Sequence, residues 1–361
     1  MNIDTLYLIA LRFCPNVGDL TIKKLRSHFG SAKNIWNASS KELTSIFKVG
    51  EKTIRYIGDE NIFKKAEREL QYCKDNQIHI THLFEDDYPF LLKECQDAPI
   101  VLYSKGNFNW NAPLLTIVGT RKMTSYGKNF TEKLVECLEG KNITVVSGLA
   151  LGIDGTAHKK AVELNIPTLG VLAHGLKNLY PYQHKMLATR MLSNGGIISE
   201  FSLDVKPDRS NFIQRNRIIA GLSPVSVIVE SAYGGGAIST IKFANSYNRE
   251  IFALPGKITD VVSQGCNRLI RNLEAQIITR PEDILEYFGE KTKKTIQAEL
   301  FIELNAEEKE IIRLLKDKGR YQIDALALEL NMPTYRLMPV LLELELKNLI
   351  KPLPGKFFEL M

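Results

Sequence analysis

Short apolar runs alternate with helical segments through the middle of this 361-residue chain. The runs cover residues 114–119, 143–148, 167–173, 195–200, 226–230, 250–256 and 275–279. Each has the length of a strand and is apolar at successive positions rather than at alternate ones. This pattern is typical of strands that are buried on both faces. We therefore expect an α/β domain over residues 112–289, built on a parallel sheet with helices on both sides.

Residues 1–80 show short helical segments joined by tight turns at Gly18 and Gly50. Such a turn before a helix, with Lys23 and Lys24 nearby, is typical of a helix-hairpin-helix or SAM-like module, whose turn amides can contact a phosphate. A small helical bundle with solvated lysines is the alternative, because residues 1–110 hold 15 Lys and Arg against 14 Asp and Glu. Residues 81–111 are expected to be a connector that packs on the sheet domain.

The end of the chain has a different organisation. Residues 290–300 are charged and are expected to be a linker. Residues 301–361 contain three helical patterns and a hairpin, which predicts a winged-helix-like domain. A winged helix commonly enters a DNA groove, but residues 300–361 hold 9 Lys and Arg against 10 Asp and Glu. This balance favours contact with another protein over DNA recognition.

Composition narrows the class of protein. The chain is 44% hydrophobic and 24% charged, which is typical of globular proteins, and it has no apolar run long enough to predict a membrane span. Asp4 and the absence of a basic stretch before the first apolar residues argue against a secretory signal. Five cysteines without a CxxC pair indicate reduced thiols in a cytoplasmic protein, and no metal site is expected.

The segment around Arg215-Asn216-Arg217 is the strongest candidate site. Residues 218–220 are apolar and are expected to pack inward, while the two guanidiniums project outward beside the glycine turn at 234–236. A glycine turn that opens a helix can receive a phosphate on its amides, and arginine adds bidentate contacts. Residues 111–299 also carry the basic surplus, with 23 Lys and Arg against 17 Asp and Glu. The sequence therefore predicts a groove for a phosphate backbone.

Other polar residues follow the predicted strands, where α/β sheets bind ligands. Asp154 and His158 are spaced i, i+4, which allows acid–base or metal chemistry but favours a simple side-chain pair. Residues 180–182 offer either an aromatic shelf for base stacking or a packed turn. Neither a dinucleotide-binding GxGxxG nor a P-loop occurs in its required context, which disfavours a nicotinamide dehydrogenase and a P-loop NTPase.

Together these motifs resemble the DNA-processing protein A (DprA/Smf) family. They are IVGTR (117–121), SGLALGIDGTAH (147–158), GGIISE (195–200), RNRIIAGLS (215–223), GGGAISTIKFA (234–244), FALPG (252–256) and SQGCNRLI (263–270). The resemblance implies a protein without catalytic residues or cofactors that binds single-stranded DNA in an extended Rossmann-like domain. It also implies a homodimer formed through that domain, and delivery of incoming DNA to the RecA recombinase during natural transformation.

Matched position by position, the resemblance and the strand-end motifs give one set of candidate DNA-binding residues. They are Gly119, Thr120, Arg121, Ser147, Gly148, Lys177, Arg215, Asn216, Arg217, Gly235, Gly236, Lys242, Ser263, Gly265 and Asn267. The sequence departs from the family pattern at Gly234 and Asn178, where Ser and Asp are common.

Two other functions stay open at this point. A nucleotide phosphoribohydrolase has a similar glycine turn, but it normally places a carboxylate soon after the turn, and residues 237–242 contain none. Glu200 and Glu230 would then be the candidate catalytic groups. A pure interaction scaffold would have no affinity for nucleic acid.

Overall fold

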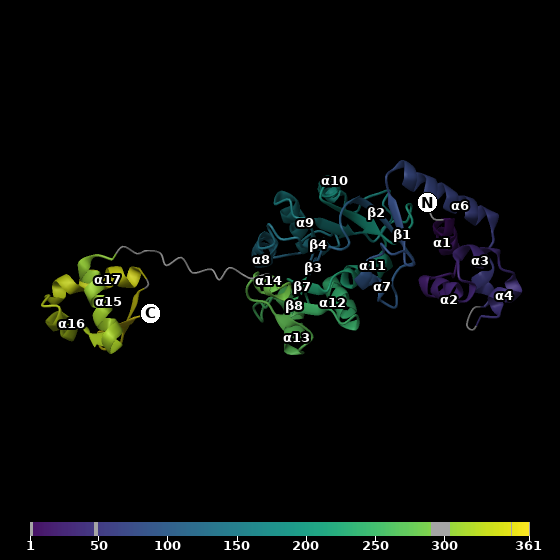
Figure 1. The fold of residues 1–361 in the computed structure, drawn as a ribbon. Coiled ribbons are helices and arrows are strands. Elements are labelled where there is room, and N and C mark those ends of the chain that lie inside the picture. Colours follow the sequence, from purple (N-terminus) through teal and green to yellow (C-terminus); the bar gives the residue numbers. More distant parts are fainter. Residues whose placement is uncertain (1–2, 47–49, 290–303, 348, 361) are drawn as a thin grey trace. The chain divides into compact units, whose positions relative to one another are not determined.

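The structure is a computed structural model that describes residues 3–46, 50–289, 304–347 and 349–360 (Figure 1). The chain forms two compact units, Met1–Lys291 and Thr292–Met361. The predicted linker at 290–300 lies outside the described residues, as do residues 47–49 directly before Gly50.

A nine-stranded sheet forms the centre of the first unit, in the order β1-β2-β6-β5-β4-β3-β7-β8-β9. Along the part of the sheet ordered β6-β5-β4-β3-β7-β8-β9, neighbouring strands run parallel, as the apolar runs predicted. The strands are β1 (His79–His82), β2 (Val101–Asn107), β3 (Leu114–Val118), β4 (Thr144–Ser147), β5 (Thr168–Val171), β6 (Gly195–Ser199), β7 (Val225–Ile228), β8 (Glu250–Ala253) and β9 (Gln276–Ile277).

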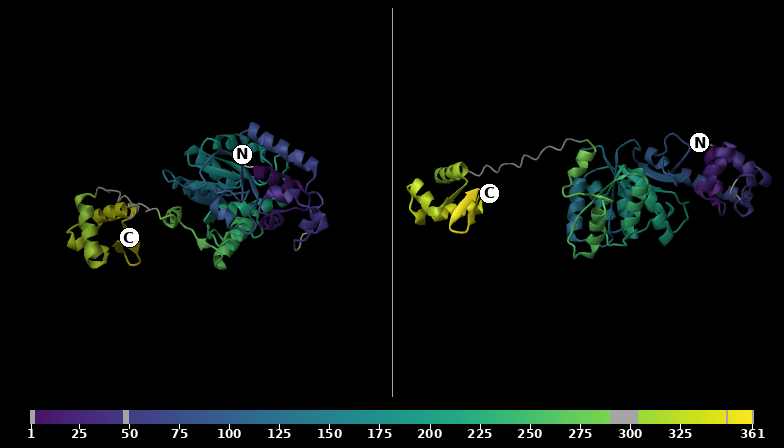
Figure 2. Two further views of the ribbon diagram at one scale, coloured as in Figure 1. Left: turned by 45° about the vertical axis from the view of Figure 1, so that its right-hand side comes forward. Right: turned by 90° about the horizontal axis from the view of Figure 1, so that it is seen from below.

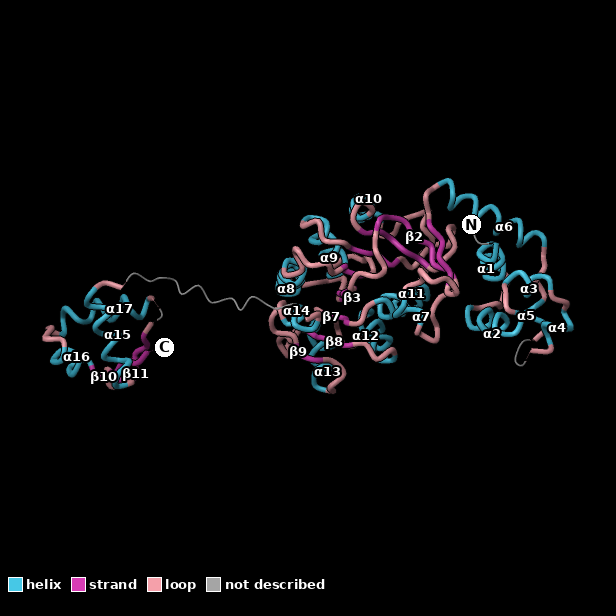
Figure 3. The backbone as a smooth tube through the Cα atoms, viewed as in Figure 1, coloured by secondary structure: helices cyan, strands magenta, loops and turns pink. Residues whose placement is uncertain are grey.

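Helices cover both faces of this sheet, as Figure 3 shows. Alternate residues of β3 enter two separate hydrophobic clusters. Leu115 and Ile117 pack in the cluster that includes α8 (Ser125–Glu136) and α9 (Ile153–Glu163). Leu114 and Val118 belong to the cluster that includes α11 (Arg209–Leu222), α12 (Gly236–Ser246) and α13 (Gln264–Arg271). Burial on both sides explains why the strands are apolar at every position.

The strand order reverses between β3 and β7. The chain passes from β3 to β4, β5 and β6 on one side, then returns through α11 to β7, which pairs with the other side of β3. At such a switch point the connections leave the sheet in opposite directions, which opens a crevice at the carboxyl ends of the strands.

The segment 81–111, predicted as a connector, contributes strands to the sheet itself. β1 and β2 pair antiparallel, and β2 continues onto β6 with Tyr103 opposite Ser199. The short helix α7 (Phe90–Lys93) lies between the two strands in the sequence. The sequence pattern did not reveal that Val101–Asn107 pairs with a strand almost a hundred residues away.

The N-terminal helices lie beside the β1–β2 end of the sheet (Figure 1, Figure 2). They are α1 (Ile3–Phe13), α2 (Asp19–Phe29), α3 (Ala32–Asn37), α4 (Ser40–Thr44), α5 (Glu51–Ile54) and α6 (Glu60–Asp75). Gly18 and Gly50 precede α2 and α5 as expected, and neither helix has a side-chain cap. The buried residues of these helices share a hydrophobic cluster with α11 and the sheet, so the helical module and the sheet form one unit.

The second unit has its own core and a three-stranded sheet, in the order β10-β12-β11. Its elements are α15 (Ala306–Lys318), β10 (Arg320–Gln322), α16 (Ile323–Glu329), α17 (Thr334–Leu346), β11 (Ile350–Leu353) and β12 (Phe357–Leu360). Asn305 and Glu308 form a capping box at the start of α15. This succession of helices and strands is that of a winged helix.

Candidate nucleic-acid interface

A pocket of about 840 Å³ opens at the switch point, at the carboxyl ends of β3 and β7. Three segments line most of it: residues 118–121 after β3, residues 207–219 of α11 and the turn before it, and residues 231–240 at the start of α12. The pocket thus joins the glycine turn, the Arg-Asn-Arg segment and the loop of Arg121, which lie far apart in the sequence.

The glycine turn ends at Gly235, which is the N-cap of α12 and makes no side-chain cap. An anion at this position would meet the amides of the first turn of α12 and the positive end of the helix dipole. Asn216 holds the turn from the opposite wall, because its Nδ2 donates to Ser239 Oγ at 2.7 Å and to the Gly236 carbonyl at 3.4 Å.

The three side chains of the Arg-Asn-Arg segment point in different directions from α11. Successive helical residues are rotated by about 100° (3.6 residues per turn), so adjacent side chains meet different neighbours. Asn216 reaches the glycine turn, Arg215 reaches the ends of β4 and β5, and Arg217 reaches Glu200 after β6. The prediction that both guanidiniums project outward is wrong. Arg215 is 3% exposed and Arg217 is 7% exposed.

Arg215 lies in the wall of the pocket. Its Nη1 donates to the carbonyl of Gly148 at 2.7 Å and to that of Val171. Burial lowers the pKa of Arg215 to about 10, although the negative charge of Asp154 acts to raise it. The guanidinium therefore stays protonated at neutral pH. Gly148 makes room for it, because a Cβ at this position would lie 2.5 Å from Nη1. Asp154 is buried too, and burial raises the pKa of its carboxyl group.

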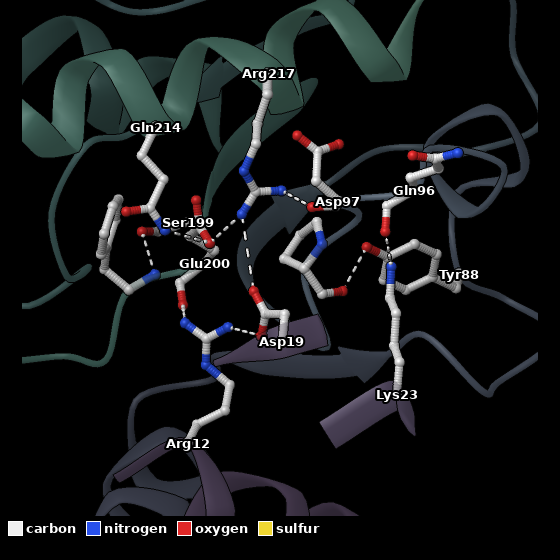
Figure 4. A network of polar contacts seen from close by, with 12 residues as sticks. Arg12, Asp19, Lys23, Tyr88, Gln96, Asp97, Ser199, Glu200, Gln214 and Arg217 are labelled. Atoms are coloured by element: carbon white, nitrogen blue, oxygen red, sulfur yellow. Dashed lines mark hydrogen bonds and ion pairs between the residues drawn. The ribbon is translucent and has the colours of Figure 1, made fainter. Parts of the chain in front are cut away.

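Arg217 points away from the pocket, into the junction with the N-terminal helices (Figure 4). It donates to the carboxylate of Glu200 at 2.5 Å and to the backbone carbonyl of Asp97, and Asp19 of α2 lies 3.8 Å away. These acceptors contact Nη1 and Nη2 of the guanidinium. The pocket lining does not include Arg217.

Aromatic and cationic side chains gather at the pocket mouth. The ring of Phe212 meets that of Tyr180 edge to face at 5.9 Å, and Arg121 Cζ lies 5.0 Å from the centre of the Phe212 ring. Arg209 is also exposed in this lining. Within the described part of the chain, neither Arg121 nor Arg209 has an ion-pair partner. Their charges therefore remain available to a ligand.

Phe212 and Arg209 were missed by the sequence reasoning. Phe212 precedes Arg215 by three residues and Arg209 precedes Phe212 by three, so all three share one face of α11. This spacing was visible in the sequence, but it becomes informative only when the direction of Arg215 is known.

The candidate residues fall into two groups. Those that line the pocket are Gly119, Thr120, Arg121, Arg215, Asn216, Gly235 and Gly236. Those outside its lining are Ser147, Gly148, Lys177, Arg217, Lys242, Ser263, Gly265 and Asn267.

Several residues of the second group hold the loops around the pocket. Ser147 Oγ donates to the Ile117 carbonyl at 2.6 Å, and the Gly265 amide donates to the Ser231 carbonyl at 2.8 Å. The side chain of Asn267 accepts a hydrogen bond from the Gly256 amide and donates one to the Gly256 carbonyl. Lys177 pairs with Asp204 on the surface.

Asp154 and His158 do not form the predicted side-chain pair. Asp154 accepts from the Gly148 amide, whereas His158 Nδ1 lies 2.7 Å from Thr168 Oγ1. His158 is fully buried. Among the described residues, no three His, Cys, Asp or Glu side chains form a group that could hold a metal ion.

Comparison with known proteins gives two matches to family models. A model described as DNA recombination-mediator protein A matches residues 79–289, and one described as DprA winged helix domain matches residues 299–356. The protein Smf of Synechocystis sp. is 35% identical over 294 residues, which cover 80% of this chain and 73% of that protein.

Two solved structures are similar to this fold. DNA processing protein A from Streptococcus pneumoniae has a TM-score of 0.62 and 27% identity, covering 79% of this chain and 98% of that one. DNA processing protein A from Helicobacter pylori, whose structure was described for its single-stranded DNA binding mode, has a TM-score of 0.54 and 28% identity, covering 59% and 95%. These matches confirm the predicted fold class, a Rossmann-like sheet domain with a winged helix.

Over residues 3–46, 50–289, 304–347 and 349–360, no helix combines the length and the apolar character that crossing a membrane requires.

Proposed function

This chain belongs to the DprA/Smf family of DNA-processing proteins, and we propose that its switch-point pocket binds single-stranded DNA. The observation that carries the proposal is that the pocket combines the ring of Phe212 with two arginines, Arg121 and Arg209, that have no ion-pair partner among the described residues, beside the open N-terminus of α12. Single strands are bound elsewhere by this combination of backbone charge and base stacking.

The geometry suggests how the strand is held. A phosphate placed at the glycine turn would meet the amides of α12 and the guanidinium of Arg121. A base would stack on the exposed part of the Phe212 and Tyr180 pair. Both contacts are indifferent to base identity, so the protein accepts any sequence, and its affinity depends on salt.

Other candidate residues support the shape of the pocket. Arg215 and Asn216 hold opposite walls of the pocket, and Arg217 fixes α11 to the N-terminal helices. We assign direct DNA contact to Arg121, Arg209 and the glycine turn, with Arg215 as a buried charge behind them. Lys177 and Lys242 lie outside the pocket and would contact only a strand that extends beyond it.

The resemblance to the family supports three further parts of the proposal. The protein acts without catalysis, forms a homodimer through the Rossmann-like domain, and delivers the bound strand to RecA in the cytoplasm. The two glutamates that a hydrolase would use lie outside the pocket lining. Glu230 accepts from the amide of Thr124 at 2.9 Å, and Glu200 pairs with Arg217, so both carboxylates are engaged outside the pocket lining.

Fluorescence anisotropy of a labelled poly-thymidine strand and its duplex, at two salt concentrations, tests the proposal. Preferential binding of the single strand that weakens with salt would support it. Equal affinity for the duplex, or no binding of either, would remove the single-strand function and direct attention to nucleotide hydrolysis.

A further inference from the structure

Tyr233 lies in the glycine turn, but its side chain is not part of the pocket lining. Its chain neighbours, Ala232 and Gly234, both line the pocket. Tyr233 itself is 61% exposed. A large aromatic ring is thus held at the rim of the pocket, where a strand that leaves the pocket on this side would pass.

Arg268 of α13 lies against this ring. Its Cζ is 4.5 Å from the centre of the Tyr233 ring, within the range of a cation–π contact. Arg268 has no ion-pair partner in the described ranges of the chain, and α13 holds a second arginine, Arg271, and no acidic residue. Tyr233 and Arg268, which we call the rim platform, therefore combine an aromatic surface with a positive charge that no carboxylate neutralises.

The backbone fastens the rim platform to the pocket. The amide of Gly265, near the start of α13, donates to the Ser231 carbonyl at 2.8 Å. A Cβ at Gly265 would lie 2.6 Å from that oxygen and 2.7 Å from the carbonyl oxygen of Ala232, so a glycine is needed for this close approach. Because Ser231 and Ala232 also line the pocket, α13 is held at a fixed place beside it.

The topology of the sheet places the rim platform on the far side of the pocket from Tyr180. Tyr180 follows β5, whereas Tyr233 follows β7 and Arg268 follows β8. In the sheet, β5 lies on one side of β3, and β7 and β8 lie on the other. A strand that enters over Tyr180 and crosses the glycine turn would therefore leave over the rim platform.

We propose that the rim platform binds a further nucleotide of a single strand whose backbone lies in the pocket, an inference that rests on the proposed function. A pocket of about 840 Å³ has the size of a small-molecule site, so it holds only a few nucleotides and the rest of the strand lies outside it. One base outside the pocket stacks on the Tyr233 ring, and a neighbouring phosphate meets the guanidinium of Arg268. Both contacts are independent of base identity.

Strand length tests the rim platform. Fluorescence anisotropy of the full chain compares a labelled strand of about twelve thymidines with one of about three, which the pocket holds alone. Tyr233→Ala should weaken binding of the longer strand by about fivefold or more, the loss of one stacked base, and leave the shorter strand unaffected. Tyr233→Phe keeps the ring and should stay within about twofold of the wild type, because stacking needs no hydroxyl.

Arg268→Ala tests the phosphate contact. For the longer strand, the slope of log affinity against log salt should fall by about 0.7, the value for one phosphate. Arg190→Ala removes an exposed arginine outside the pocket lining and should leave this slope unchanged. Circular dichroism melting confirms that each variant is folded. A slope that is the same in Arg268→Ala and the wild type would contradict the phosphate contact.

The outcomes separate the rim platform from the pocket. If Tyr233→Ala and the wild type bound the longer strand equally, the platform would be refuted and the pocket function would stand. Equal losses for both strands would also refute it, because Tyr233 would then act on the pocket itself. A wild type that binds neither strand would remove the pocket function and the platform together. Altered sedimentation of Tyr233→Ala with unchanged DNA affinity would assign the platform to a protein partner instead.

Discussion

Arg217 of α11 and Glu200, which follows β6, form a buried ion pair with their nitrogen and oxygen atoms 2.5 Å apart (Figure 4). Two residues of the N-terminal helices complete the network. Arg12 donates to the Glu200 carbonyl at 3.1 Å and pairs with Asp19, which also lies near Arg217. The helix that carries the pocket residues is therefore fastened on its other side to the N-terminal module.

We expect Arg217→Ala to act on stability rather than on DNA contact. The substitution leaves Glu200 buried without its charged partner, which typically costs about 3–5 kcal/mol. Urea denaturation should show this loss, and the protein that remains folded should bind poly-thymidine with nearly wild-type affinity. Unchanged stability together with weak DNA binding would instead make Arg217 a direct DNA ligand.

Arg121→Ala should show the opposite behaviour. Arg121 is exposed and has no ion-pair partner in the described structure, so the free energy of unfolding should stay the same. Loss of a charged contact to phosphate should weaken binding of poly-thymidine by about 1–3 kcal/mol. The slope of log affinity against log salt should fall by about 0.7, the value for one phosphate of a single strand.

Arg190→Ala is a matched control for Arg121, because Arg190 is an exposed arginine of α10 (Lys185–Met191) outside the pocket lining. Its affinity and salt slope should equal those of the wild type. If Arg190→Ala weakened binding as much as Arg121→Ala, charge in general and not the pocket would account for the affinity.

Gly148→Ala should disturb the pocket through Arg215. The added Cβ would lie 2.5 Å from Arg215 Nη1, so the buried guanidinium has to move. Crowding of this kind typically costs about 1–3 kcal/mol of stability, and affinity for poly-thymidine should fall as well.

Gly236→Ala is the control, because a Cβ there meets nothing within 4 Å and the residue opens a helix. Thermal unfolding should show equal or slightly higher stability for this variant. Equal unfolding curves for both glycine variants would show that Arg215 does not depend on the space at Gly148.

His158 should make stability depend on pH. Burial lowers the pKa of His158 from 6.5 to about 3, with smaller contributions from His184 and Arg215. Between these two values the unfolded chain binds a proton that the folded protein excludes, so stability falls as the pH is lowered. The slope from this group approaches about 1.4 kcal/mol per pH unit within the window.

The variant His158→Asn removes this titration and keeps a polar group near Thr168 Oγ1. Urea denaturation at pH 7 and pH 5 should therefore show a smaller loss of stability than in the wild type. His79→Asn, at an exposed histidine, should leave the pH dependence as it is. If His158→Asn and the wild type lost the same stability between pH 7 and pH 5, the pH dependence would not come from His158.

The sequence by itself determined the parallel sheet, the family and the segments that meet at the pocket. Each of these depends on local pattern. Continuous apolar runs require cover on both faces, and glycines at strand ends are compatible with close backbone approach. Because the carboxyl ends of parallel strands share one edge, the sequence alone predicts that Arg121 and the turn at 234–236 lie close together.

Only the tertiary structure decided which way the side chains of α11 point. Arg215 and Arg217 are two positions apart and chemically identical, yet one lies in the pocket wall and the other in the module junction. Their acceptors, the Gly148 carbonyl and the Glu200 carboxylate, directly follow two separate strands, β4 and β6. A buried guanidinium is stable only where such acceptors converge, and that convergence is a property of the folded chain.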